Sequence, residues 1–118
     1  MPEHSFFYLG LALLLLHEMD AVRCREWRIF PGLSGLSDRW GELVFLLAHV
    51  PLYFLLLATL ASEPGRPGLI RGLSVFCLVH AGLHLLFLRH PKNEFTDRLS
   101  WGLIGGAALA GALELGLG

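Results

Sequence analysis

Charged residues are scarce in this chain, and their scarcity argues against a soluble fold. Only 16% of the 118 residues are charged, whereas 54% are hydrophobic and the mean hydropathy is +0.59. Soluble domains carry about 25% charged residues, and a domain of this length buries only part of its surface. A soluble globular enzyme is therefore excluded as a class. Intrinsic disorder is excluded too, because disordered chains are poor in large apolar residues.

An excess of charge of one sign is absent as well. The formal net charge is −1, so no strong electrostatic field points to nucleic acid as a partner. Two cysteines, Cys24 and Cys77, are too few for a disulfide framework. No Lys or Arg precedes the first apolar run, and that run ends in polar residues rather than a small-residue cleavage site. We therefore expect a retained helix there and no signal peptide.

Long apolar runs are what the chain has instead. Four of them approach the ~20 residues that a helix needs to cross a bilayer, and they predict helices at about 5–28, 38–61, 68–89 and 96–117. Helices are expected because backbone groups in lipid must be hydrogen-bonded within the segment. Short connections favour antiparallel neighbours. The sequence predicts an all-α integral membrane four-helix bundle, up-down-up-down, forming a single transmembrane domain over 1–118.

The basic residues predict how this bundle is oriented. The loops after the first and third helices carry seven Lys and Arg residues, and the opposite side carries two. The seven are Arg23, Arg25, Arg28, Arg39, Arg89, Lys92 and Arg98, and the two are Arg66 and Arg71. Under the positive-inside rule these two loops lie in the cytoplasm. We expect a bacterial inner (plasma) membrane protein with both termini outside.

Four of the six histidines fall at a similar depth in the cytoplasmic half of the predicted helices. They are His17, His49, His80 and His84. Ionisable residues inside a span usually face the bundle interior, and residues three or four apart share a helix face. His17 and Asp20 therefore share one face, as do His80 and His84. Glu26 is expected on the opposite side of the first helix from His17, paired with a neighbouring Arg.

This cluster has the composition of a metal site. Two imidazoles one helical turn apart can bind one ion, and ligands from facing helices complete a four- or five-coordinate site. The predicted ligands are His17, Asp20, His49, His80 and His84, and the predicted ion is Zn or non-haem Fe. Glu18 is the predicted catalytic residue, as a general base on a metal-bound water. The alternative cofactor is b-type haem, held by an axial pair of the same histidines.

The motif around His17 carries a family resemblance. The segment His17-Glu18-Met19-Asp20, followed by Glu26-Trp27-Arg28, resembles uncharacterised small bacterial multi-pass membrane families with His and acidic residues, including the HxxEE-type family. The resemblance implies a multi-pass membrane protein, possible enzymes among its relatives, and no established substrate. A looser similarity, in His80-xxx-His84, is to membrane metal-hydrolases and fatty-acid hydroxylases.

Two kinds of function stay open at this point. The first is a lipid-active metal-dependent hydrolase or oxidoreductase, with membrane lipid as its partner. The second is a non-enzymatic membrane subunit, a small proton or metal transporter, or a haem carrier. Gly102 and Gly106 on the last helix permit close approach of another helix, so they predict packing within the bundle, in a homo-oligomer or with a membrane partner. An open cluster favours the enzyme, and a dry, fully paired cluster favours the structural role.

Overall fold

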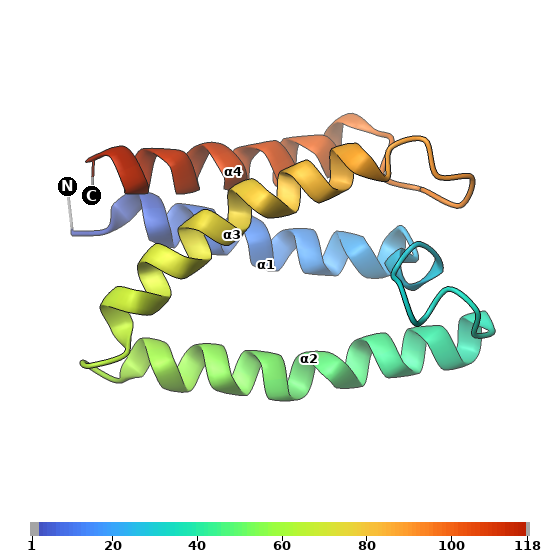
Figure 1. Cartoon of the computed structure of the whole chain (residues 1–118), viewed down its shortest axis with the longest axis horizontal. Coiled ribbons are helices and arrows are strands. Elements are labelled where there is room, and N and C mark those ends of the chain that lie inside the picture. Colours follow the sequence, from blue (N-terminus) through green and yellow to red (C-terminus); the bar gives the residue numbers. More distant parts are fainter. Residues whose placement is uncertain (1–2, 118) are drawn as a thin grey trace.

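The computed structural model describes residues 3–117, and its regular elements are four long helices and one short 3-10 helix. In chain order they are α1 (Ser5–Arg23), η1 (Glu26–Arg28), α2 (Asp38–Ala61), α3 (Arg66–Leu86) and α4 (Arg98–Leu117). All four α-helices are long and apolar enough to cross a membrane. Successive helices alternate in direction, so the start of α1 and the end of α4 lie next to each other, at the same end of the molecule as the α2–α3 turn (Figure 1). The predicted all-α, up-down-up-down membrane fold is confirmed.

Three of the helix ends that differ from the bounds predicted from the sequence lie at a left-handed residue, a proline or a capping side chain. The first helix stops at Arg23 rather than at 28, because Arg25 takes a left-handed conformation with φ of 52°. α3 begins at Arg66 with a proline in its first turn, a position where the missing N–H costs nothing. α4 begins at Arg98 because the carboxylate of Asp97 accepts the backbone N–H of Ser100 at 2.8 Å, which caps the helix.

The most extensive helix packing among the described residues joins α4 to α1 and α3. A Cβ added at Gly111 would lie 2.6 Å from the backbone oxygen of Ser74, and one at Gly106 would lie 3.1 Å from a methyl carbon of Leu13. A Cβ added at Gly102, by contrast, meets nothing within 4 Å. Small residues let helix backbones approach closely in a membrane. Within this chain Gly106 and Gly111 therefore serve the packing of α4, and Gly102 does not.

The second helix stands away from the other three along most of its length (Figure 1). Only Gly41 and Phe45 are buried among its residues. Both lie near its first turns, where η1 fills the space beside it: a Cβ at Gly41 would be 2.5 Å from the Trp27 ring. The indole N–H of Trp27 also donates to Asp38 at 3.0 Å, and Arg28 forms an ion pair with the same carboxylate. η1 thus anchors the start of α2. Toward the other end of this helix Leu56 and Leu60 pack against Phe7, Leu11 and Ile70.

Replacing Gly111 with Ala is expected to lower the free energy of unfolding by about 1–3 kcal/mol, because overpacking at a backbone atom cannot relax without moving a helix. Gly102→Ala is the matched control on the same helix. It is expected to leave stability unchanged or raise it slightly, because alanine favours the helix over glycine. Unfolding in mixed detergent micelles, followed by circular dichroism, measures both. Equal stability of the two variants would contradict the close approach of α4 to α3.

Candidate metal centre

Four side chains from three elements converge in the interior of the molecule. His17 of α1, Glu26 of η1, and His80 and His84 of α3 each offer one ligand atom, and these atoms all lie within 4.8 Å of one another. The ring centroid of His17 lies 4.5 Å from that of His80 and 5.0 Å from that of His84. The Nε2 atom of His84 lies 3.2 Å from Nε2 of His80 and 3.6 Å from a Glu26 oxygen. This arrangement matches the donor set of a tetrahedral metal site.

Helix geometry explains how the three imidazoles meet. His80 and His84 are one turn apart, so both project from the same face of α3. His17 projects toward them from α1, and its ring meets both of theirs edge to face. Phe95, which is fully buried, covers the group: its ring centroid is 5.5 Å from that of His17 and 4.6 Å from that of His84. The aromatic ring excludes water from that side of the cluster.

Three ring nitrogens of the buried imidazoles have no hydrogen-bond partner among the described residues, whereas the Nε2 atoms of His80 and His84 lie within hydrogen-bond distance of each other. His17 has no exposed surface, and His80 and His84 are less than a tenth exposed. Neither ring nitrogen of His17 has a partner among the described residues, and Nδ1 of His80 has none either. Buried polar atoms are nearly always partnered, and an unpartnered one costs about 1–3 kcal/mol. The described side chains therefore do not form a self-contained hydrogen-bonded network around these nitrogens.

Glu26 is the candidate ligand that sequence reasoning missed. A continuous helix to residue 28 would place it opposite His17, but the chain turns at Arg25 and brings Glu26 back to His84. Burial raises the pKa of the Glu26 carboxyl to about 7; nearby Glu18 raises it too, and nearby His49 lowers it. Residues 24–28 contain no Gly or Pro, so the usual signals of a helix end are missing there.

Asp20 was predicted as a ligand, and the structure places it elsewhere. Its two carboxylate oxygens accept hydrogen bonds from Arg23 Nε at 2.7 Å and from Ser100 Oγ at 2.6 Å. Asp20 is 6% exposed, so these bonds offset the cost of burying its charge. The residue therefore ties α1 to α4 and does not join the cluster. Of the five predicted ligands, the structure thus leaves Asp20 outside the group of four.

His49 was also predicted as a ligand, and it lies outside the group of four. Its Nδ1 donates to the backbone oxygen of Phe45 at 2.6 Å, and its Nε2 shares a hydrogen bond with a carboxyl oxygen of Glu18 at 2.6 Å. Both ring nitrogens are thus satisfied without an ion. Glu18, the predicted catalytic base, is the other half of this pair. Glu18 of α1 and His49 of α2 both act electrostatically on Glu26. The pair is therefore near the cluster, although neither residue belongs to it.

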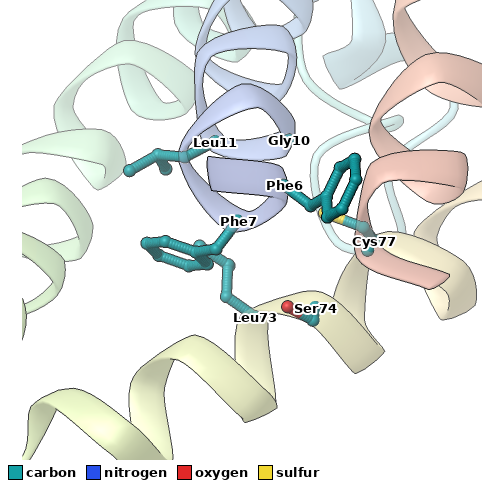
Figure 2. A pocket seen from close by; sticks show the side chains of 8 residues that line it. Phe6, Phe7, Gly10, Leu11, Leu73, Ser74 and Cys77 are labelled. Atoms are coloured by element: carbon teal, nitrogen blue, oxygen red, sulfur yellow. The ribbon is translucent and has the colours of Figure 1, made fainter. Parts of the chain in front are cut away.

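One cavity adjoins the group of four, a second adjoins the Glu18–His49 pair, and a third lies apart from both. A cavity of about 400 Å³ borders Glu26, His80 and His84, and the remainder of its wall is apolar. A smaller one of about 120 Å³ lies between α1 and α2 beside Glu18 and His49. Figure 2 shows the third, where Phe6, Phe7 and Leu11 of α1 face Leu73, Ser74 and Cys77 of α3. Its volume is about 10 Å³, which is no more than one water molecule needs.

Comparison with known proteins places the chain in a family without a known activity. Protein dispatched homolog 3 of Gallus gallus is 27% identical over 114 residues, which are 94% of this chain and 8% of that protein. The chain thus spans about 8% of the length of this curated relative. No solved structure matches significantly. The profile of the Family of unknown function (DUF6713) matches residues 3–118. This agrees with the expected uncharacterised multi-pass membrane family, and the chain belongs to DUF6713.

Proposed function

We propose that this protein is a membrane metalloprotein that holds one divalent ion at His17, Glu26, His80 and His84. The observation that carries the proposal is the convergence of their four ligand atoms within 4.8 Å. Unpartnered ring nitrogens on His17 and His80 support it, because an ion would give at least one of these buried nitrogens a bonding partner. Three imidazoles and one carboxylate suit Zn or non-haem Fe. Glu18 and His49 would support Glu26 from outside the ligand set.

A compact ion fits this arrangement better than b-type haem. The two axial histidines of a haem stand on opposite faces of a wide macrocycle. Here three imidazoles meet edge to face, with all three centroid separations at or below 5.0 Å. Glu26 adds a fourth donor at the same point, only 3.6 Å from His84. Such a set closes around a small ion and leaves no slot for a macrocycle between its members.

The activity we propose is that of a lipid-active metal-dependent hydrolase or oxidoreductase. A metal ion in such a site polarises a substrate oxygen or activates a bound water. The 400 Å³ cavity brings its apolar walls directly to Glu26, His80 and His84, and this favours an enzyme over a purely structural subunit. A transporter needs a polar route across the bilayer. The 10 Å³ cavity at the crossing of α1 and α3 is lined mostly by apolar side chains, which does not favour such a route.

Metal content is the direct test. Elemental analysis of the protein, purified without chelator, is expected to find about one Zn or Fe per chain. The His80→Ala, His84→Ala double variant should lose the metal, because it lacks both of the ligands that α3 supplies. His90→Ala, in the loop after α3 and outside the group of four, is the matched histidine control. Asp20→Asn should also keep the metal, since Asp20 bonds to Arg23 and Ser100 instead.

Two outcomes contradict the metal proposal. One is a double variant that folds, by circular dichroism, and retains the metal of the wild type. The other is wild-type protein that stays free of metal after growth and refilling with either Zn or Fe. Loss of metal in Asp20→Asn alone would instead restore the original ligand assignment.

We further propose that the loops 24–37 and 87–97 face the cytoplasm of a bacterial plasma membrane, with both termini outside. The support is the excess of seven Lys and Arg on that side over two on the other. The four helix directions place these two loops at one end of the molecule (Figure 1). A reporter fused after Arg66 should read periplasmic and one fused after Lys92 cytoplasmic. The reverse pattern would invert the orientation and place the centre near the outer face.

A further inference from the structure

We propose that the 400 Å³ cavity is the binding site for a single-chain acyl lipid, with its oxygen-bearing end at the His–Glu centre. The inference rests on the proposed metal centre and names the class of substrate that reaches it. The volume lies in the range of ligand pockets, about 300–1,000 Å³. The occupant we commit to is a long-chain fatty acid, and the argument for it comes from the shape, position and polarity of the walls.

One wall of the cavity is a single face of α3. Phe76, His80, His84 and Phe87 all line it, and their spacings of four, four and three residues follow one helical stripe. The facing wall comes from the segment after η1 and includes Ile29 and Phe30. Both walls are apolar apart from the two imidazoles on the α3 wall and the Glu26 carboxyl on the facing wall.

The depth of this face suits one acyl chain. Because the carboxyl end is placed at His84, the length available to the chain is the helical rise from His84 to Phe76, which at 1.5 Å per residue is ~12 Å. This is less than half of the ~30 Å hydrocarbon core, so the rest of a long chain would lie in the surrounding lipid. α3 ends at Leu86, so the Phe87 end of the cavity lies at the membrane boundary and the Phe76 end lies toward its middle. A chain that enters along this wall would run in the same direction as the neighbouring lipid chains.

Side-chain exposure indicates an entry from the lipid. Phe30, Phe76 and Leu83 line the cavity and are 49%, 43% and 47% exposed. His80 and His84 are 8% and 6% exposed, so the rim is apolar and open while the polar groups stay recessed. A ligand that fits must therefore place an apolar part at the opening of the cavity and a polar group next to His80 and His84.

The polar lining identifies the headgroup. Glu26, His80 and His84 are its polar members among the described residues, and neither Lys nor Arg lines the cavity. Phosphate is usually bound by Arg or Lys, and a phospholipid head would find neither here, only the proposed ion. A small carboxyl group needs only the metal ion that we propose at this corner. A single acyl chain with a carboxyl end is the amphiphile that matches both halves of the cavity.

Binding of radiolabelled palmitate to the full-length, metal-loaded protein in detergent tests the inference. Saturable binding near one palmitate per chain is expected for the wild type. Leu83→Trp places a larger side chain at the cavity wall and should weaken binding at least ~10-fold, the ratio that corresponds to 1.4 kcal/mol. Leu85→Trp is the matched control, because Leu85 is 60% exposed on the same helix and does not line the cavity.

Metal content, measured on the same samples, separates this inference from the proposed metal centre. Both variants should keep the wild-type metal, since neither residue is a candidate ligand. Metal-loaded protein that binds no palmitate saturably, or Leu83→Trp and Leu85→Trp variants with equal affinity, would overturn the acyl-chain site while the metal centre stands. If a protein that never holds metal binds palmitate saturably and only Leu83→Trp weakens that binding, the acyl-chain site would be supported and the metal centre would be rejected. Tighter binding of a phospholipid than of palmitate would overturn the choice of headgroup.

Discussion

The cost of placing ionisable side chains inside a bilayer governs the arrangement of this small protein. A carboxylate or imidazole in hydrocarbon must face a partner or a cavity. Several of the ionisable side chains on these helices are hydrogen-bonded to another side chain. Glu114, which is 5% exposed, lies 2.5 Å from His4, and Glu18 is hydrogen-bonded to His49. These pairs join distant parts of the chain. His17 stands apart, because it is fully buried and neither of its nitrogens is paired.

The part of the site that depends on local geometry could be predicted from the sequence. Four apolar runs of membrane-spanning length implied four antiparallel helices, and the structure has them. Turn-by-turn spacing placed His80 and His84 on one face, and equal depth in antiparallel helices placed His17 opposite them. These relations need only the rise and period of a helix. They hold because α1 and α3 are regular over the residues concerned.

The remaining site depends on contacts that no local pattern contains. Asp20 is turned from the cluster by Ser100, which is 80 residues away in the chain. His49 belongs to α2, and nothing in its spacing indicates that this helix stands away from the other three (Figure 1). Glu26 joins the cluster because α1 ends five residues before the predicted limit of 28. A helix end without Gly or Pro is decided by tertiary packing, here by Trp27 against Gly41.

The central claim is that three imidazoles and one carboxylate bind one ion within the bilayer, at the recessed end of an apolar cavity. X-ray absorption spectroscopy at the metal edge of the purified protein examines that ligand set directly. The account predicts a shell of nitrogen and oxygen at ~2.0–2.2 Å with the outer-shell scattering of three imidazoles. A sulfur shell at ~2.3 Å, which would come from Cys24 or Cys77, would contradict it. A first shell of oxygen alone, without imidazole scattering, would contradict it equally.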